Sequence, residues 1–363
     1  MTALRAGIFL ADGSSFEGVG IGPLGISLGE AVFFTGMTGY EEALTDPSYE
    51  GQLLVFTYPL IGNYGVDASV RQHRSICAAG AVCKRFSRHP SHYRSSGSLP
   101  DWLGKSGVRS IEEVDTRAIV TRLREAGTMH AALAVGDESI AQAPFALRAS
   151  AQLAEDTPAL VRAVSRRSRL DLGAGPPRVA LLDCGAKAGI SDRLSAAGAE
   201  VVEVPFDTGP KELLGLGADG FVVSNGPGNP ADLGLVIETL REVIALGTLP
   251  TFGVCLGHQL IALALGAKTY KLKYGHRGAN QPVRICWSGG VMITAHNHGY
   301  AVDAASLPDG VEETMVNLND GTNEGLRHRT LPVSSVQFHP EAAPGPGDAG
   351  YLIDDFVRSL ASR

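Results

Sequence analysis

The amino-acid sequence predicts an α/β protein of two domains, in which a doubly wound, mostly parallel sheet follows a domain of mixed α and β structure. Three observations lead to this prediction. The 363 residues are enough for two separate cores. From Arg178 onward, short apolar runs alternate with helix-forming stretches, which is typical of a parallel sheet with helices on both faces. Before residue 150, β-like runs are separated by turns without that regular alternation.

The amino-terminal domain, predicted over residues 1–150, begins with a hairpin. Ala6–Ala11 and Ser15–Ile21 are β-like runs on either side of an Asp-Gly pair, which is typical of a tight turn. Further β-like runs are Ala31–Phe34 and Leu53–Thr57. Downstream, Asp115 is suited to cap a helix that Gly127 would end. The apolar face of this helix would consist of Ile119, Val120 and Leu123.

A linker is predicted between the domains, over residues 151–177. The stretch contains Asp156-Thr157-Pro158 and ends in the Gly/Pro-rich run Gly173–Pro177, and both are typical of connectors. A basic cluster lies between them and consists of Arg166, Arg167 and Arg169. These arginines could dock a partner, but the composition favours a solvated charge run in a linker.

The carboxyl-terminal domain is predicted over residues 178–363. Its expected strands are Val179–Asp183, Val201–Pro205, Gly220–Ser224 and Thr251–Val254. Its expected helices lie around Ser191–Ala197, Asp232–Leu246 and Gln259–Leu265. In a doubly wound sheet, ligands bind beyond the carboxyl ends of the strands. Cys255 directly follows one of these strands, so the sequence predicts a thiol at the site.

Cys255 lies at a sharp turn between that strand and the helix that follows. A glycine stands two positions before the thiol, at Gly253, and another two positions after it, at Gly257, which permits the cramped strand-to-helix turn called a nucleophile elbow. Such a turn exposes the sulfur and aims the first N–H groups of the helix at it, which favours the thiolate. The simpler interpretation is a small, buried, hydrophobic cysteine.

An imidazole and a carboxylate far downstream complete a nucleophilic set. His339 and Glu341 follow the run Val336-Gln337-Phe338, and alternate positions on a strand share one face. A thiol, an imidazole and a carboxylate that orients the imidazole form a Cys-His-Glu triad. A His-x-Glu sequence alone is more often surface chemistry. Together with the elbow cysteine and a glycine-rich loop, the catalytic interpretation is favoured.

That glycine-rich loop is Ser224–Pro230, which ends a strand and precedes a helix. Its Gly226 and Gly228 leave backbone N–H groups accessible to a ligand. A tetrahedral intermediate needs such donors for its oxyanion. Alone, the loop would be a tight turn without a ligand. Beside an elbow cysteine, we interpret it as part of an oxyanion hole.

These motifs, with Gly253–Gln259 and His339-Pro340-Glu341, resemble the class I, or triad, glutamine amidotransferases. More narrowly, the chain resembles the glutamine-hydrolysing small subunits of carbamoyl-phosphate synthetases over nearly its whole length. This narrower resemblance rests on the amino-terminal half. The segments that carry it are Met37–Glu42, Leu44–Tyr49, Tyr58–Asn63 and Asp115–Ala118.

The resemblance implies roles that spacing alone does not identify. It implies that the N–H of Leu256 completes the oxyanion hole, and that the amino-terminal domain contributes one residue to the glutamine site. The residues implied at the substrate are Ser48, Gly226, Gly228, Gln259, Asn297, Gly299 and Tyr300. The chain departs from the family pattern at Ala188, Gly189 and His296, where arginine, asparagine and glutamine are usual.

His296 and His298 also suggest a different chemistry. Two histidines two positions apart, after the apolar strand Gly290–Ala295, could bind a metal. No other ligand lies near them in the sequence, and the resemblance assigns their neighbours to glutamine. We therefore expect no metal site.

Composition excludes several kinds of partner. A net charge of −7 argues against nucleic acid and against an anionic membrane surface. The five cysteines contain no CxxC pair, which suits a reducing cytoplasm. No apolar run approaches the ~20 residues that cross a bilayer, and the first residues do not read as a secretory signal.

The predicted function is therefore that of a cytoplasmic glutaminase subunit. No ATP site is recognisable in the chain, so we expect it to bind no cofactor. The resemblance implies a large synthetase subunit that uses ATP and Mg²⁺, receives ammonia through an internal tunnel and makes carbamoyl phosphate for arginine and pyrimidine synthesis. The rivals are amidotransferases for anthranilate or guanylate and γ-glutamyl hydrolases, which lack the first 150 residues. A catalytically silent scaffold is a further alternative, against which the intact triad argues.

Overall fold

The computed structural model describes residues 4–150 and 156–361. The chain forms two compact units, Met1–Glu155 and Asp156–Arg363. This boundary lies inside the segment predicted to be a linker. Within the described residues, every helix is too short or too polar to cross a bilayer.

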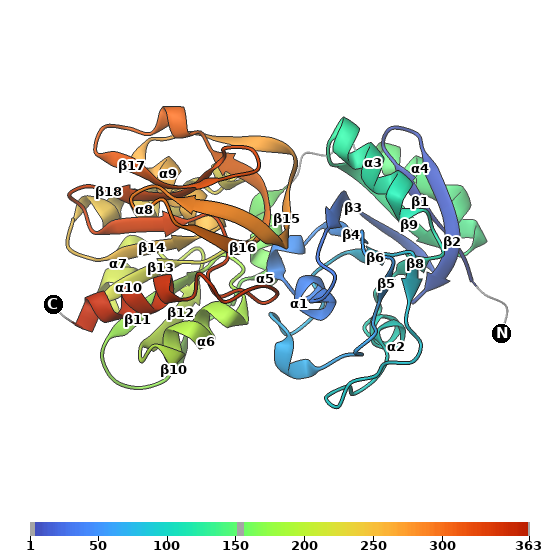
Figure 1. The fold of residues 1–363 in the computed structure, drawn as a ribbon, viewed down its shortest axis with the longest axis horizontal. Coiled ribbons are helices and arrows are strands. Elements are labelled where there is room, and N and C mark those ends of the chain that lie inside the picture. Colours follow the sequence, from blue (N-terminus) through green and yellow to red (C-terminus); the bar gives the residue numbers. More distant parts are fainter. Residues whose placement is uncertain (1–3, 151–155, 362–363) are drawn as a thin grey trace. The chain divides into compact units, whose positions relative to one another are not determined.

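The amino-terminal unit is built on a closed β-barrel with the strand order β1-β2-β8-β6-β4-β3-β9 (Figure 1). The barrel strands are β1 (Leu4–Leu10), β2 (Ser15–Ile21), β3 (Gly25–Phe34), β4 (Gln52–Phe56), β6 (Gly80–Val82), β8 (Ser110–Glu112) and β9 (Met129–Val135). A separate two-stranded sheet joins β5 (Leu60–Ile61) to β7 (Arg85–Phe86). The expected hairpin is confirmed, because β1 and β2 pair antiparallel. The closure into a barrel goes beyond what the sequence predicts.

The barrel interior is filled by side chains from alternate positions of its strands. Ile8 of β1, Phe33 of β3 and Leu133 of β9 belong to one buried cluster. The same cluster includes Ile119 and Leu123 of α3 (Thr116–Ala126), so the apolar face of this helix packs on the barrel core. Burying side chains of this size stabilises the unit by about 1.5–3 kcal/mol each.

The helix predicted after Asp115 is confirmed at both ends. The Asp115 carboxylate accepts a hydrogen bond of 3.0 Å from the N–H of Ala118, which is the expected cap, and the helix ends before Gly127. The other helices of this unit are α1 (Tyr40–Leu44), α2 (Leu99–Lys105) and α4 (Asp137–Ser150). Ala143 and Leu147 of α4 pack on Ala132 and Ala134 of β9.

The carboxyl-terminal unit contains a ten-stranded sheet with the order β10-β12-β11-β13-β14-β19-β18-β17-β15-β16. Its strands are β10 (Leu170–Leu172), β11 (Arg178–Asp183), β12 (Glu200–Pro205), β13 (Gly220–Val223), β14 (Thr251–Val254), β15 (Thr269–Ile285), β16 (Val291–Val302), β17 (Val311–Asn317), β18 (Asn323–His328) and β19 (Val333–Val336). The central strands from β12 to β19 are parallel, as predicted. Beyond β19 the sheet continues as an antiparallel extension that the sequence analysis does not describe.

Helices cover both faces of the parallel strands, which confirms the doubly wound α/β class. One face packs against α5 (Thr157–Val164), α8 (Gly234–Ala245) and α9 (Leu256–Leu265). The other face packs against α6 (Ala188–Ala196) and α10 (Tyr351–Ala361). A short helix, α7 (Pro210–Gly215), contributes Leu213 to the first of these two cores.

The predicted linker is wrong for residues 156–177, because they fold as part of the carboxyl-terminal unit. The fully buried Val161 of α5 belongs to the same core as α8 and α9. Arg166 forms an ion pair of 2.9 Å with Glu203 of β12, so it is not part of a solvated charge run. The Pro and Gly residues of this segment are typical of a linker, but the apolar side of α5 makes it part of the core. Residues 151–155 lie outside the described residues.

This boundary gives the first prediction. A chain that begins at Asp156 should unfold cooperatively. A chain that begins at Arg178 should lose at least about 2 kcal/mol of unfolding free energy, because it lacks the buried valines of α5. Urea titration followed by circular dichroism measures the difference. Equal midpoints for the two chains would show that α5 does not stabilise this unit.

Candidate active site

Cys255 adopts a backbone conformation that residues with side chains rarely adopt. Its φ is 55° and its ψ is −104°, at the point where β14 ends and α9 begins. Its N–H donates a hydrogen bond of 2.9 Å to the carbonyl of Val336 on β19. The predicted elbow geometry is therefore confirmed. The prediction of an exposed sulfur is wrong in the isolated chain, since Cys255 is only 2% exposed.

The two glycines around the thiol are required by close packing between strand and helix. A Cβ atom on Gly253 would lie 2.7 Å from the carbonyl of Gly257, and one on Gly257 would collide with the carbonyl of Val223 on β13. Neither glycine has a positive φ. The glycines therefore allow α9 to start directly against β13 and β14, which places Cys255 at the carboxyl edge of the parallel strands.

His339, Glu341 and Lys187 form a buried chain of charges. Nδ1 of His339 lies 2.7 Å from Oε1 of Glu341. Nζ of Lys187 lies 2.9 Å from that same oxygen and donates a second hydrogen bond, of 2.6 Å, to the carbonyl of Ala342. The side chains of Lys187 and Glu341 are 2% and 0% exposed. The carboxylate thus holds the imidazole by one nitrogen and is itself held by the lysine.

This arrangement shifts the pKa values of both partners. Burial alone would raise the pKa of Glu341, but Lys187 and His339 outweigh it and lower the pKa to about 2. Burial alone would lower the pKa of His339, but Glu341 and, more weakly, Cys255 raise it to about 10. The imidazole is therefore a strong proton acceptor beside the thiol. Its Nε2 makes no hydrogen bond among the described residues, so this nitrogen is the one available for proton transfer.

His339 and Glu341 were predicted to meet because they share one face of a strand, and this explanation is wrong. Strand β19 ends at Val336, so the two residues do not lie at alternate positions of a strand. His339 instead forms an isolated bridge with Ala295 of β16, and Glu341 lies in the turn that follows. The turn brings the carboxylate back to the imidazole.

Amide groups surround the thiol on its other side. Sγ of Cys255 lies 3.6 Å from the backbone carbonyl of Asn297 and 3.7 Å from Nε2 of Gln337. Gln259 donates hydrogen bonds from its Nε2 to the carbonyl of Tyr300, at 2.8 Å, and to Oε1 of Gln337, at 3.0 Å. These contacts join α9, β16 and the segment after β19 around the sulfur. Asn297 and Tyr300 lie within β16, which runs on to Val302 and does not end at Ala295 as the sequence analysis expected.

The glycine-rich loop lies against the elbow. A Cβ atom on Gly226 would collide with the carbonyl of Cys184 and approach the Leu256 side chain to 2.9 Å. Gly228 has a φ of 89°, and a Cβ atom there would collide with Thr157. The loop is also tied to the charged chain, because Oδ1 of Asn225 accepts a hydrogen bond of 3.0 Å from the N–H of Lys187. Leu256 is the first residue of α9, so its N–H belongs to the unpaired amino end of that helix.

Most of the residues predicted at the site thus meet in the carboxyl-terminal unit. Ser48 belongs to the other unit, where it lies buried in the short helix η1 (Pro47–Tyr49). Its N–H donates a hydrogen bond of 2.9 Å to Oδ1 of Asp46. Its contact with glutamine stays a prediction, as do those of Gly299 and the other residues implied by resemblance.

Comparison with known proteins identifies both units. The family model described as "Carbamoyl-phosphate synthase small chain, CPSase domain" matches residues 8–133, and "Glutamine amidotransferase class-I" matches residues 180–359. The chain is 47% identical to the carbamoyl phosphate synthase small chain of Symbiobacterium thermophilum, with 96% of each chain covered. It is 46% identical to the small chain of Akkermansia muciniphila, covering 99% of this chain and 98% of the relative. It is 45% identical to the small chain of Clostridium acetobutylicum, covering 96% of this chain and 98% of the relative.

The chain belongs to the carbamoyl-phosphate synthase small-chain family. Its class I glutamine amidotransferase domain contains the Cys255 elbow and the buried charges described above. The matched amino-terminal region covers most of the barrel strands.

The sequence analysis missed two residues of this family member's site. Lys187 directly precedes the departures at Ala188 and Gly189, and it is the cation that holds Glu341. The available signal is a lysine four residues after the end of the apolar strand β11, because a lysine held near a buried strand end needs a partner for its charge. Gln337, between Gln259 and Cys255, stood within a quoted motif without a role.

The packing of the elbow predicts the effect of one methyl group. Gly257→Ala should destabilise the protein by about 1–3 kcal/mol, because the new Cβ atom meets the backbone of β13. Gly215→Ala is the matched control, since it adds the same group to a helix with no atom within 4 Å and should be neutral or stabilising. Thermal unfolding compares the two variants. An unchanged midpoint for Gly257→Ala would contradict the proposed packing.

The charged chain predicts a pH dependence. Lys187→Met should cost about 3–5 kcal/mol at neutral pH, because it leaves the buried Glu341 without its cation. The lowered pKa of Glu341 means that its contribution is fully present above its ordinary pKa of about 4.5 and is lost as the pH falls towards about 2. The difference in unfolding free energy between wild type and variant should therefore become smaller as the pH falls below 4.5.

Denaturant unfolding from pH 7 downwards, as far as both proteins stay folded, measures this gap. The control is Arg169→Met, which removes an exposed ion pair with Asp171 and should cost less than about 1 kcal/mol at every pH. A gap that is the same at every pH would contradict the assignment of the stabilisation to an ionised Glu341.

Proposed function

We propose that this chain hydrolyses L-glutamine to glutamate and ammonia through a thioester on Cys255. The observation that carries the proposal is the strained, buried thiol beside an imidazole whose other nitrogen is fixed by Glu341. The family to which the chain belongs supports the choice of substrate. Ionised side chains that hold one nitrogen of an imidazole set its tautomer and leave the second nitrogen to exchange protons with a nucleophile.

In the first half-reaction, Nε2 of His339 already holds the proton given up by Cys255, because the raised pKa of His339 keeps the imidazole protonated at neutral pH, and the sulfur attacks the side-chain amide carbon of glutamine. The negative charge that develops on the amide oxygen would be stabilised by backbone N–H groups of Leu256 and of the Gly226–Gly228 loop. His339 then gives the proton to the leaving nitrogen. The carbon–nitrogen bond breaks, ammonia leaves, and the γ-glutamyl thioester remains on Cys255.

In the second half-reaction, His339 takes a proton from a water molecule, which attacks the thioester carbonyl. The carbon–sulfur bond breaks, the sulfur regains a proton from His339, and glutamate leaves. Glu341 stays ionised throughout and stabilises the imidazolium that forms in each half. Lys187 keeps Glu341 ionised and in place.

We further propose that the ammonia passes to a large synthetase subunit. Ammonia in water is mostly protonated near neutral pH and is then a poor nucleophile, so its direct transfer through an internal tunnel avoids that loss. The large subunit would use ATP and Mg²⁺ to make carbamoyl phosphate from bicarbonate, for arginine and pyrimidine synthesis in the cytoplasm. Small-chain relatives at 45–47% identity support this partner. This chain itself would bind no cofactor for the hydrolysis.

The proposal predicts that loss of the thiol stops synthesis from glutamine but not synthesis from ammonia. In the complex with the large subunit, Cys255→Ser should reduce glutamine-dependent synthesis by about 10³-fold or more, while synthesis from added ammonia continues. Cys286→Ser is the control, because it removes an exposed thiol away from the elbow. Equal loss with both nitrogen sources would show that Cys255 is needed for the fold and not for the chemistry.

The roles of the imidazole and the carboxylate predict a ranking. His339→Asn should approach the loss seen without the thiol, because the proton acceptor is gone. Glu341→Gln should be milder by about 10–100-fold, because an amide can still orient the ring without stabilising its charge. Steady-state glutaminase rates give the ranking. Activity close to wild type in His339→Asn would remove the histidine from the mechanism.

A further inference from the structure

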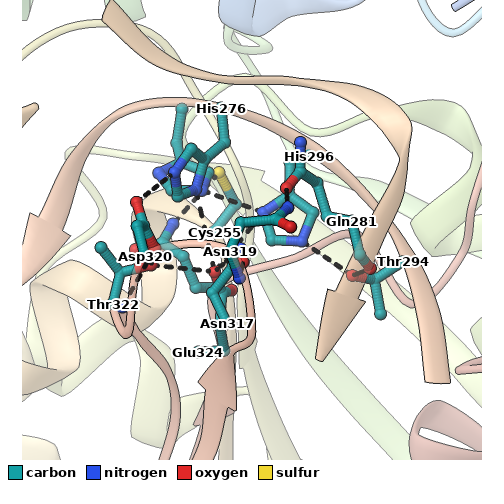
Figure 2. Close-up of polar contacts among 12 residues, drawn as sticks. Cys255, His276, Gln281, Thr294, His296, Asn317, Asn319, Asp320, Thr322 and Glu324 are labelled. Atoms are coloured by element: carbon teal, nitrogen blue, oxygen red, sulfur yellow. Dashed lines mark hydrogen bonds and ion pairs between the residues drawn. The ribbon is translucent and has the colours of Figure 1, made fainter. Parts of the chain in front are cut away.

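The antiparallel extension contains a second cluster of reactive side chains, beside the active site but outside the mechanism. The cluster consists of His276 of β15, His296 and His298 of β16, and Glu324 of β18. Figure 2 labels His276, His296 and Glu324. One ligand atom from each side chain lies within 4.8 Å of the three others. The register explains the gathering: His276 pairs directly with His298, and His296 lies two positions further on the same face of β16.

Two atoms of this cluster lack the hydrogen bonds that buried polar groups normally make. Nδ1 of His276 and Oε2 of Glu324 have no hydrogen-bond partner among the described residues. The His276 and Glu324 side chains are 9% and 0% exposed, so water does not replace those partners from outside. Oε1 of Glu324 accepts a hydrogen bond of 3.0 Å from Nδ2 of Asn317. It lies 3.9 Å from Nδ1 of His276 and 3.7 Å from Nδ1 of His296, too far for hydrogen bonds to these rings.

The outer nitrogens are each fixed by a hydrogen-bond acceptor. Nε2 of His276 lies 2.8 Å from the carboxylate of Asp320, and Nδ1 of His298 lies 2.8 Å from the carbonyl of Tyr300. Both nitrogens must therefore carry the proton. The third ring, that of His296, also carries its proton on the outer nitrogen, and the acceptor there is the hydroxyl group of Thr294 (Figure 2).

The Thr294 hydroxyl donates its hydrogen to the carbonyl of Gln281 at 2.9 Å. It can then only accept from Nε2 of His296, which lies 2.7 Å away. All three rings are thus held with N–H outward and a lone pair inward.

Lone pairs that face one another repel unless a cation lies between them. The inward nitrogens of His296 and His298 are only 3.1 Å apart. In a tetrahedral zinc site with bonds of about 2.0 Å, neighbouring ligand atoms are about 3.3 Å apart. Three of the six pairs of atoms here are 3.1, 3.7 and 3.9 Å apart, and all six lie within 4.8 Å, so the cluster would contract around a bound ion.

We propose that His276, His296, His298 and Glu324 bind one divalent transition-metal ion, of which Zn²⁺ fits best. Three imidazoles and a carboxylate suit zinc, and outward N–H groups bound to acceptors are the usual outer shell of metal-binding histidines. Four protein ligands leave no open position, so the ion is structural and takes no part in the hydrolysis. In the sequence only His296 and His298 stand close together, which is why no metal site is expected from it. The fold supplies the other two ligands.

The position of the ion suggests what it stabilises. His296 and His298 flank Asn297, whose carbonyl lies 3.6 Å from the Cys255 sulfur. The ion would therefore hold the middle of β16 against β15 and β18 at the point where β16 meets the active site.

The test is metal binding by the full-length chain after removal of metals with a chelator. We expect the wild type to retain one Zn²⁺ per chain after desalting and to unfold at a higher temperature with Zn²⁺ than without it. His296→Gln and Glu324→Gln should each weaken Zn²⁺ binding by more than about 100-fold, beyond the range typical for loss of an outer-shell partner. His130→Gln, at an exposed position, and Cys255→Ser should keep it.

Wild-type binding below one ion per chain would overturn the proposal, as would equal binding in His296→Gln. Loss of binding in Cys255→Ser would also overturn it, because the ion would then sit on the active-site thiol. If the ligand variants fail to fold, Co²⁺ on the wild type still decides: tetrahedral absorption without a thiolate charge-transfer band supports the cluster, and such a band contradicts it. These measurements need no glutamine, so their outcome is independent of the proposed glutaminase activity.

Discussion

The left-handed backbone of Cys255 is the constraint on which the rest of the site depends. A side chain at φ 55° is tolerated only where its surroundings leave no alternative. Here the strand β14 is fixed between β13 and β19, and α9 must start at once against their carboxyl ends. Gly257 allows this start because any larger residue would meet the backbone of β13. The sulfur is thereby held at one point, and the loop, imidazole and amides are arranged around it.

A second constraint is the burial of three ionisable groups in one row. Lys187 lies more than 150 residues before His339 and Glu341 in the sequence. Each of the three charges would be costly to bury alone. Their mutual contacts offset that cost and fix the direction of the imidazole. In the proposed mechanism the same contacts couple stability to function, because the carboxylate that orients His339 also needs Lys187 to remain ionised. The candidate site is thus also a part of the folded core.

The sequence predicts those parts of the molecule that depend on local pattern. The β1–β2 hairpin, the capped helix α3, the parallel strands and the elbow at Cys255 all follow from neighbouring residues. What depends on distant pairing is not predicted. Nothing near β1 in the sequence shows that β9 will close a barrel on it, and nothing near His298 shows that His276 and Glu324 will join it. Residues 156–177 were misjudged because Pro and Gly outweighed the apolar face of α5, and Lys187 was passed over because its partner lies at the other end of the unit.

The most direct test of the account is to trap the covalent intermediate. The chain would be mixed with L-glutamine, quenched in acid within the first turnover and digested, and the peptides would be weighed by mass spectrometry. The account predicts a γ-glutamyl group on the peptide that contains Cys255, labile to hydroxylamine as a thioester should be, and on none of the peptides that contain the four other cysteines. Glutamate released at the normal rate without any such adduct on Cys255 would contradict it.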